Sequence, residues 1–551
     1  MDHHDAFSTE TAGLREASSP RIVRLYDGDS FDLRIHPVRK RIGDTEVRML
    51  GYNGSIPGPT LHVDQGSEIT VQVANDGYVE ATVHWHGLRL QNLYDGVPQE
   101  TQAPIKPGET FTYKLRFPDP GLYWYHPHIR EDFAQEMGLY APIVVEPFDP
   151  SYWPHVDRQL TITLDDVLIE DGRIVPFRRS GPTFTAMGRF GNVMLINGET
   201  TFSGQAVAGE IVRLYLVNTA NTRIFNFALR GARMKLVGGD SGRYEREAFV
   251  DEVLLSPSER AVVDVLFDTL GEAHLEHRTP DHTYDLGVFS VEGTAIGDTV
   301  GSFGELRTDP DLTTERALIE PDLEREPDKV LSIVALMPLL YGGEAQAASS
   351  YVCPMHPEVA SNSPGTCPKC GMKLVPSDAL PASASDQHEG HAHGEHEPSG
   401  HGGHQHGDHG DGLEWEDLMP EINRATDPTN MIWKLVDRES GAENHAISWA
   451  FTVGDRVKIR LINEMDSDHP MHHPFHIHGA GRFLILSRDG RPEPNLVWKD
   501  TVLLRAGETV DILLYVTNPG LWMAHCHIAE HIESGMMFSF EVARSSEGEE
   551  R

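Results

Sequence analysis

The sequence predicts an all-β protein made of three related antiparallel sandwich units, because two elements recur three times along the chain. Each copy of the first element is a Gly, an alternating β-rich run and an Asn: GSEITVQVAN (66–75), GEIVRLYLVN (209–218) and GDRVKIRLIN (454–463). The second element follows each time as GETFTYKLRFPDPG (108–121), SERAVVDVLFDTLG (258–271) and GETVDILLYVTNPG (507–520). Period-2 alternation of apolar residues between turn signals is typical of antiparallel sandwiches. No segment shows sustained helical periodicity.

These repeats divide the chain into three units of about residues 20–150, 155–300 and 328–545. The third unit contains an insertion of different composition, with a Cys-rich segment at 351–376 and a low-complexity His-rich tract at 388–410. The tract has too few apolar residues to pack a core, so we expect it to be disordered without metal. It would act as a weak buffer for Cu(II) or Zn(II), or as an inert linker.

Charge and cysteine content exclude several classes of protein. Lys plus Arg is 46 and Asp plus Glu is 84, a formal charge of −38, which argues against a nucleic-acid or anionic-membrane partner. Three of the four cysteines lie in the insertion, and with 30 histidines they indicate metal ligation rather than a disulfide framework. The given chain shows neither a signal-peptide h-region nor an apolar run long enough to span a bilayer.

Histidines occur as four H-x-H pairs in the first and third units, whereas the corresponding stretches of the second unit lack them. In a strand, residues i and i+2 point to the same face, so each pair aims two imidazoles at one region. Eight imidazoles suit Cu or Fe and exceed the needs of one ion, which predicts a metal cluster between the two units. The eight are His84, His86, His126, His128, His476, His478, His525 and His527.

Cys526 stands between two of these histidines and must therefore face away from the cluster. His473 lies at an odd offset from His476 and also points away, while His531 and Met536 follow Cys526 on the next turn. Two His, one Cys and a weak axial Met form a blue-copper electron-transfer site. An electron at Cys526 could reach the adjacent histidines over a distance of roughly 10 Å.

The motifs HWHG (84–87), HPH (126–128), HPFHIHG (473–479) and HCHIAEHIESGM (525–536) resemble those of the multicopper oxidases, specifically three-domain bacterial laccase-like and metal-oxidising members. The resemblance covers everything but the insertion. It implies three cupredoxin-like Greek-key β-sandwich domains, four copper ions, and a periplasmic or exported location. It also implies type 1 copper on His473, Cys526, His531 and Met536, type 2 copper on His84 and His476, and a type 3 pair on His86, His126, His128, His478, His525 and His527.

Asp95 matches the acidic residue that in this family relays protons to bound oxygen, although an Asp before Gly is also a common turn residue. The family often has a Glu directly after the histidine that matches His531. Ile532 occupies that position, which puts a second relay carboxylate in doubt. We expect the neighbouring Glu530 and Glu533 to face solvent.

Residues 351–376 resemble the small heavy-metal-binding domain of copper and silver ATPases and metal-efflux adaptors, through the signatures CPMHP and CPKCGM. Cys353, His356, Cys367 and Cys370 could close a tetrahedral site, and Met355 and Met372 add soft ligands. Cu(I) trafficking and a structural Zn site both remain open. Four further residues, His3, His4, Met471 and His472, look like surface residues, and the last two could border a substrate entrance.

The pattern as a whole indicates a copper-dependent oxidase that couples four one-electron oxidations near His473 to the reduction of O₂ to water. Phenols, Cu(I) and other metal ions are the candidate donors, and the insertion favours copper detoxification. One alternative is a copper-binding or storage protein without turnover, but a store needs no type 1 Cys connected to a cluster. A nitrite reductase is disfavoured because three units are present. The oligomeric state is open.

Overall fold

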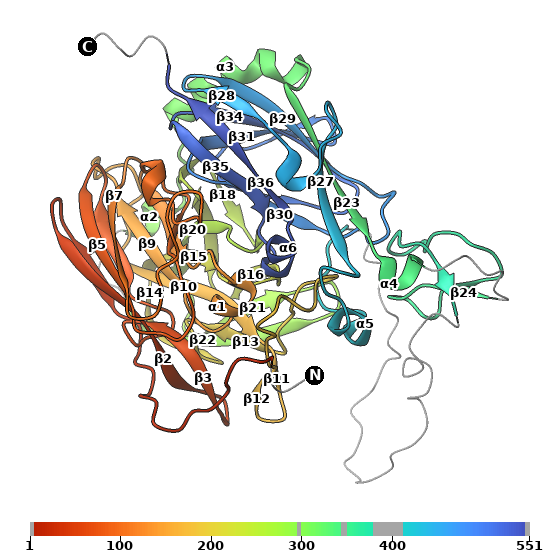
Figure 1. The fold of residues 1–551 in the computed structure, drawn as a ribbon. Coiled ribbons are helices and arrows are strands. Elements are labelled where there is room, and N and C mark those ends of the chain that lie inside the picture. The colour runs from red at the N-terminus through yellow and green to blue at the C-terminus, as the bar shows by residue number, and fades with distance from the viewer. Residues whose placement is uncertain (1–4, 295–298, 343–349, 378–410, 546–551) are drawn as a thin grey trace.

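A computed structural model describes residues 5–294, 299–342, 350–377 and 411–545. Its secondary structure is dominated by strands, which form three pairs of sheets, and this confirms the predicted all-β class (Figure 1). The His-rich tract at 388–410, together with His3 and His4, lies outside the described residues. Within the described ranges, no helix is both long and apolar enough to cross a membrane.

The first domain packs a five-stranded sheet against a four-stranded sheet, with one continuous apolar core between them. The five-stranded sheet has the order β1 (Ile22–Leu25), β4 (Thr60–Asp64), β9 (Ala141–Glu146), β8 (Gly121–His126), β6 (His84–His86). The four-stranded sheet has the order β3 (Thr45–Tyr52), β2 (Ser30–Ile42), β5 (Glu68–Asn75), β7 (Thr110–Arg116). The short helices η1 (Asn92–Tyr94) and α1 (Glu131–Ala134) occupy loops of this domain.

The second domain has a six-stranded and a five-stranded sheet around its own core. The first has the order β13 (Val193–Ile196), β10 (Arg158–Val167), β15 (Glu210–Asn218), β20 (Arg260–Phe267), β17 (Arg233–Gly239), β18 (Gly242–Val250). The second has the order β14 (Phe202–Ala208), β22 (Thr283–Thr294), β21 (Gly271–Arg278), β16 (Phe225–Arg230), β19 (Val253–Leu255), and β11 (Ile169–Glu170) pairs with β12 (Arg173–Ile174). Helix α2 (Thr299–Phe303) follows β22.

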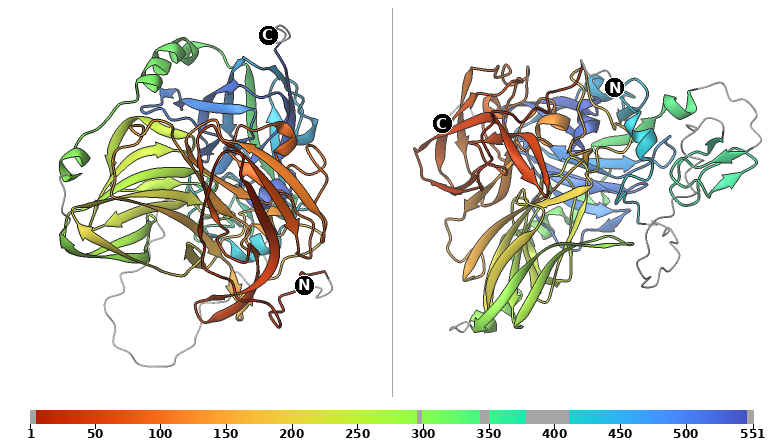
Figure 2. Two further views of the ribbon diagram at one scale, coloured as in Figure 1. Left: turned by 90° about the vertical axis from the view of Figure 1, so that its left-hand side faces the viewer. Right: turned by 90° about the horizontal axis from the view of Figure 1, so that it is seen from below.

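The third domain repeats this plan and carries the insertion, which projects beyond the three domains in the right-hand view of Figure 2. One sheet has the order β27 (Ile432–Asp437), β23 (Lys329–Leu336), β29 (Arg456–Asn463), β34 (Thr509–Val516), β31 (Gly481–Arg488), β32 (Arg491–Pro492). The other has the order β28 (Ala450–Thr452), β36 (Met537–Ala543), β35 (Gly520–Cys526), β30 (His473–Ile477), β33 (Thr501–Leu504). The insertion contains β25 (Ala360–Ser361), β24 (Tyr351–Val352) and β26 (Val375–Pro376). The third domain also has the short helices α4 (Pro338–Tyr341), α5 (Pro420–Arg424), η3 (Asn444–Ala446) and α6 (Ala529–Glu533).

The two recurring sequence elements are neighbouring antiparallel strands in every domain: β5 with β7, β15 with β20, and β29 with β34. The Asn that ends the first element has the same role each time. Asn75, Asn218 and Asn463 are buried, and the side-chain amide of each donates hydrogen bonds to backbone carbonyls in two separate segments. The Asn is therefore needed at this position in each domain, because buried backbone carbonyl oxygens require a hydrogen-bond donor.

The structure contains one long helix that the sequence pattern did not reveal, α3 (Pro310–Glu324). Asp309 caps it by accepting from the backbone N–H groups of Asp311 and Leu312, and Pro310 occupies the first turn. Of its residues only Leu312 and Ile319 are buried, against a cluster that includes leucines of β31. Two apolar anchors seven residues apart lie on one face but are too few to produce a periodic signal.

Candidate metal centres

The four H-x-H pairs lie on or directly after two pairs of antiparallel strands, one from the first domain and one from the third. Strand β6 pairs with β8, which puts His84 opposite His126. Strand β30 pairs with β35, which puts His476 opposite His525. Because the two strand pairs face each other at the domain interface, imidazoles far apart in sequence become neighbours.

All eight imidazoles are buried and form one cluster. Rings from the two domains approach to 4.1 Å between the centroids of His84 and His478, and to 3.8 Å between those of His86 and His476. The Nε2 atom of His478 lies 3.3 Å from that of His128 and 3.0 Å from that of His525. A further group joins His86, His126 and His527, with ring centroids 5.0–5.7 Å apart. Among the described residues, the second domain adds no histidine to this cluster.

The hydrogen bonds of these imidazoles leave nitrogen atoms free for a metal. His84, His126 and His476 each have Nδ1 beside a backbone carbonyl oxygen, and in the described part of the chain the Nε2 atom of each has no hydrogen-bond partner. Those carbonyls belong to Asp95 at 2.7 Å, Pro127 at 2.8 Å and Asp500 at 2.9 Å. Donation from Nδ1 selects the tautomer with an Nε2 lone pair, and burial lowers the pKa of His126 and His476 well below the usual value. Buried, neutral and unpaired nitrogens of this kind suit transition-metal ligation.

Asp95 lies at the end of η1 and contacts two members of the cluster. One of its carboxylate oxygens is 2.7 Å from Nδ1 of His478, and its backbone carbonyl accepts from His84. The side chain is 1% exposed, so it is a buried carboxylate beside two histidines rather than a solvated turn residue.

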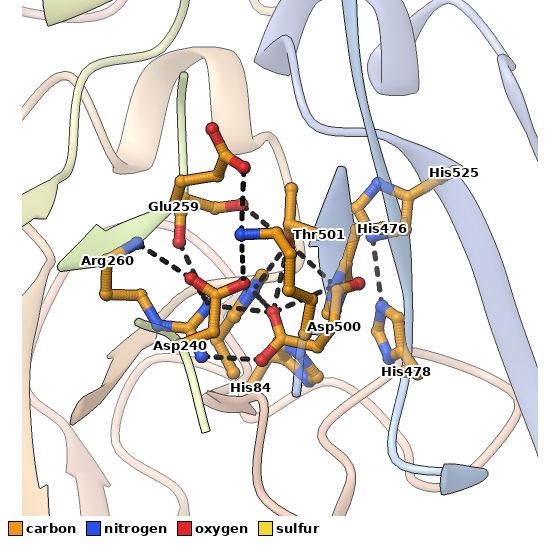
Figure 3. A network of polar contacts seen from close by, with 12 residues as sticks. His84, Asp240, Glu259, Arg260, His476, His478, Asp500, Thr501 and His525 are labelled. Carbon is orange, nitrogen blue, oxygen red and sulfur yellow. Dashed lines mark hydrogen bonds and ion pairs between the residues drawn. The ribbon is translucent and has the colours of Figure 1, made fainter. Parts of the chain in front are cut away.

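Asp500, which the sequence reasoning missed, also supports the cluster and lies among His476, Thr501 and Arg260 (Figure 3). Its carboxylate lies 3.0 Å from Nε2 of His86 and accepts two hydrogen bonds from Arg260, at 2.7 and 2.5 Å. Arg260 belongs to β20 of the second domain and is fully buried. It stands at the third position of the second repeated element, where the other copies have Thr110 and Thr509. An Arg in place of Thr at this position was the sequence signal that could have indicated a special role for Arg260.

Glu131 was missed as well, and the expectation for Glu530 was wrong. Glu131 of α1 lies 3.2 Å from Nδ1 of His128, and burial raises its pKa well above the usual value. Glu530 is 1% exposed instead of facing solvent, and burial raises its pKa to about 8. Glu533 is half-buried and accepts from the backbone N–H of Glu131 at 2.9 Å. Helices α1 and α6 pack together, and this contact covers the carboxylates.

A second site lies on the other side of β35, around Cys526. Its Sγ atom is 3.5 Å from Nδ1 of His473 and 3.6 Å from Nδ1 of His531, and all three side chains are fully buried. Met536 is also buried, and its carbonyl accepts from the backbone N–H of Cys526. Burial raises the pKa of the Cys526 thiol, so a thiolate there requires a bound cation. The donor set fits copper.

Met471 and His472, expected at the surface, are both fully buried, so that prediction is wrong. Glu414 covers this stretch: its carboxylate lies 2.6 Å from Nδ1 of His472 and also accepts from the backbone N–H of that residue. Glu414 belongs to the segment that returns from the insertion to the third domain, and sequence alone does not show where that segment packs.

In the insertion, the four predicted ligands converge. The ligand atoms of Cys353, His356, Cys367 and Cys370 all lie within 4.8 Å of one another. Hydrogen bonds from Cys370 and His356 lower the pKa of the Cys353 thiol, as expected for a metal-binding thiolate. A pocket of about 440 Å³ opens beside them and is lined also by Met355 and Glu414.

Comparisons with known proteins agree with this architecture. Profiles of the multicopper oxidase family match residues 37–149, 173–272 and 419–546, and a heavy metal binding domain matches residues 350–377. Multicopper oxidase MmcO of Mycobacterium tuberculosis is 26% identical over 556 residues, covering 96% of this chain and 89% of that protein. Copper resistance protein A of Escherichia coli is 25% identical over 304 residues, covering 47% of this chain and 49% of that protein.

The comparison with solved structures shows the same fold. A multicopper oxidase from Campylobacter jejuni, described as a metallo-oxidase, superposes with a TM-score of 0.63 at 20% sequence identity, over 98% of this chain and 99% of that one. With three matching family profiles, relatives along nearly its whole length and buried His/Cys sites where those profiles match, the chain belongs to the multicopper oxidase family and is an oxidase.

Proposed function

We propose that this oxidase holds four copper ions and transfers electrons singly from a reducing substrate to O₂, which it reduces to water. Type 1 copper would bind His473, Cys526, His531 and Met536. Type 2 copper would bind His84 and His476, and the type 3 pair would bind the remaining six histidines of the cluster. When bound, copper supplies the one-electron redox steps and the affinity for O₂.

One observation carries this proposal: His525 and Cys526 are consecutive but belong to different sites. His525 lies opposite His476 in the strand register, whereas Cys526 lies opposite Phe475 and turns its sulfur toward His473. The backbone of one strand therefore connects the two sites directly. A copper store has no use for such a connection, and this favours turnover over storage.

The buried carboxylates would serve the proton requirement of O₂ reduction. Asp95 touches His84 and His478, so it is placed to pass protons to the cluster. Asp500 holds His86 through its carboxylate and His476 through its carbonyl, which makes it a positioning residue.

Cuprous ion is the proposed physiological donor, and phenol oxidation is a side activity. The thiol- and thioether-rich insertion favours soft Cu(I), and it belongs to the domain that holds Cys526. Two of the relatives are described as a copper resistance protein and a metallo-oxidase. The exported location that the family resemblance implies stays a prediction.

The deciding experiment compares electron donors on fully copper-loaded protein. Steady-state O₂ consumption is measured with Cu(I), Mn(II), Fe(II) and a phenol, each over a range of concentrations. We expect Cu(I) to give the highest kcat/KM. A higher value for the phenol would make this protein a laccase by preference, and no O₂ uptake with any donor would leave copper storage as the function.

A further inference from the structure

The inserted heavy-metal-binding domain docks on the third domain through Met372 and Lys373. The Lys373 ammonium lies 2.9 Å from the Asp468 carboxylate, and the Lys373 carbonyl accepts from the Tyr341 hydroxyl at 2.7 Å. Between these contacts, the sulfur of Met372 lies 3.3 Å from Nδ1 of His469. One of the two soft residues outside the four-ligand cluster is thus held against an imidazole of the oxidase body.

Met372 was expected to add a soft ligand to the metal site of the insertion, whereas its sulfur lies beside His469 of the third domain, and both side chains are fully buried. Each side chain brings a donor atom to the contact, the thioether sulfur of Met372 and the Nδ1 atom of His469. A thioether and a neutral imidazole are the donors that select Cu(I) over hard divalent ions. Metal-to-donor distances of about 2.0–2.3 Å, as known for zinc with nitrogen and sulfur, allow donors this far apart to share one ion.

The pair also lies between two other metal sites. On one side, Met372 follows Cys370 of the four-ligand cluster by two residues. On the other side, the His469 ring is 6.0 Å from the ring of Trp433. Trp433 in turn packs against both histidines beside Cys526, with centroid distances of 4.7 Å to His473 and 4.3 Å to His531. Packed side chains therefore connect the insertion with the proposed type 1 site.

We propose that Met372 and His469 form a transient Cu(I) site at which the substrate ion, passed on by the cysteines of the insertion, is oxidised. This inference rests on the proposed function and identifies where its substrate binds. Each Cu(I) would lose one electron and become Cu(II), and His469 and Trp433 would pass that electron to an oxidised type 1 copper held by His473, Cys526 and His531. No proton is exchanged in this step. Because Cu(II) is harder than Cu(I), it binds the thioether weakly and leaves.

The test compares wild type with Met372→Leu, using Met431→Leu as the matched control, because Met431 is equally buried in the same apolar cluster and belongs to no metal site. Each substitution removes one buried thioether and nearly conserves volume, so the fold should tolerate both. Copper-loaded protein is mixed anaerobically with one equivalent of Cu(I) as its acetonitrile complex, and loss of the blue absorption is followed by stopped flow. We expect Met372→Leu to bleach about 10-fold more slowly or worse, as for loss of a metal-supporting group, and Met431→Leu to behave as wild type.

Two further measurements separate the possible failures. Competition with a colorimetric Cu(I) chelator should show about 10-fold weaker binding of one equivalent in Met372→Leu, a readout independent of turnover. Hydroquinone should bleach all three proteins at one rate, since it does not need the site. If Cu(I) bleaches Met372→Leu as fast as wild type, or binds it equally well, the Met372–His469 site is refuted. If wild type is bleached by hydroquinone and not by Cu(I), the cuprous function itself fails.

Discussion

Replacing Arg260 with Met should destabilise the protein strongly, because it leaves a buried carboxylate unpaired below the histidine cluster. The side chain is 0% exposed and makes a two-point ion pair with Asp500. Three carboxylates (Asp240, Glu259, Asp500) and two cations (Arg260, Lys499) share this network, so the variant changes its charge from −1 to −2. Removing one partner of a buried pair costs about 3–5 kcal/mol.

For domains of this size, that cost corresponds to an apparent Tm lower by about 6–20 °C. Calorimetry on copper-free protein is the suitable assay, because bound copper would stabilise the folded state by mass action. The control is Arg24→Met, which breaks an ion pair to Asp64 whose two side chains are 44% and 43% exposed. That surface pair is worth about 0–1 kcal/mol, so the control should melt close to wild type.

The double variant Arg260→Met/Asp500→Asn removes the unpaired charge and should recover part of the loss. If Arg260→Met melts within the range of the control, Arg260 does not hold Asp500 as described, and the second domain has no supporting role in the cluster.

Three other perturbations test the copper sites. Cys526→Ser should abolish the blue absorption and substrate oxidation while leaving the far-UV circular dichroism unchanged, because the thiolate is the type 1 ligand that starts the electron path; a variant that stays blue would exclude this assignment. Asp95→Asn should keep normal copper content and normal anaerobic reduction of type 1 copper but be reoxidised slowly by O₂; equal slowing of both halves would indicate a distorted turn instead. Replacing residues 350–410 with a short Gly/Ser linker changes the loop-closure free energy by only roughly 1 kcal/mol, so blue colour and phenol oxidation should persist while Cu(I) oxidation at limiting copper falls; unchanged Cu(I) oxidation would make the insertion dispensable.

The fold class could be predicted because an antiparallel sandwich leaves a local signal in the sequence. Here that signal is the alternation of apolar and polar residues along each strand and the recurrence of the same Gly and Asn positions in all three domains. The H-x-H pairs could be found for the same reason, since a strand alone determines which residues share a face. Helix α3 was missed because only two of its residues, Leu312 and Ile319, are buried, which is too few to produce a helical period in the sequence. Its N-cap residue, Asp309, is of a type that is also common in turns, so it did not identify the start of a helix.

What could not be predicted depends on contacts between domains. Arg260 and Asp500 are 240 positions apart, and nothing local to either residue indicates the other. Glu530 was expected to face solvent because the sequence places it on a turn, but α1 of the first domain packs against α6 and covers it. The role proposed for His469 could not be predicted, because it depends on how the insertion packs against the third domain and brings Met372 beside this histidine.

The placement of ligands on β35 also determines how the enzyme would fail under stress. The Cys526 site is built within the third domain, with ligands from β30, β35 and the turn after it, and survives as long as that domain stays folded. The histidine cluster needs β6 and β8 of the first domain against β30 and β35 of the third, so a small separation of the two domains dismantles it. Heating or mild denaturant should therefore produce a protein that is still blue and still accepts electrons, yet no longer consumes oxygen.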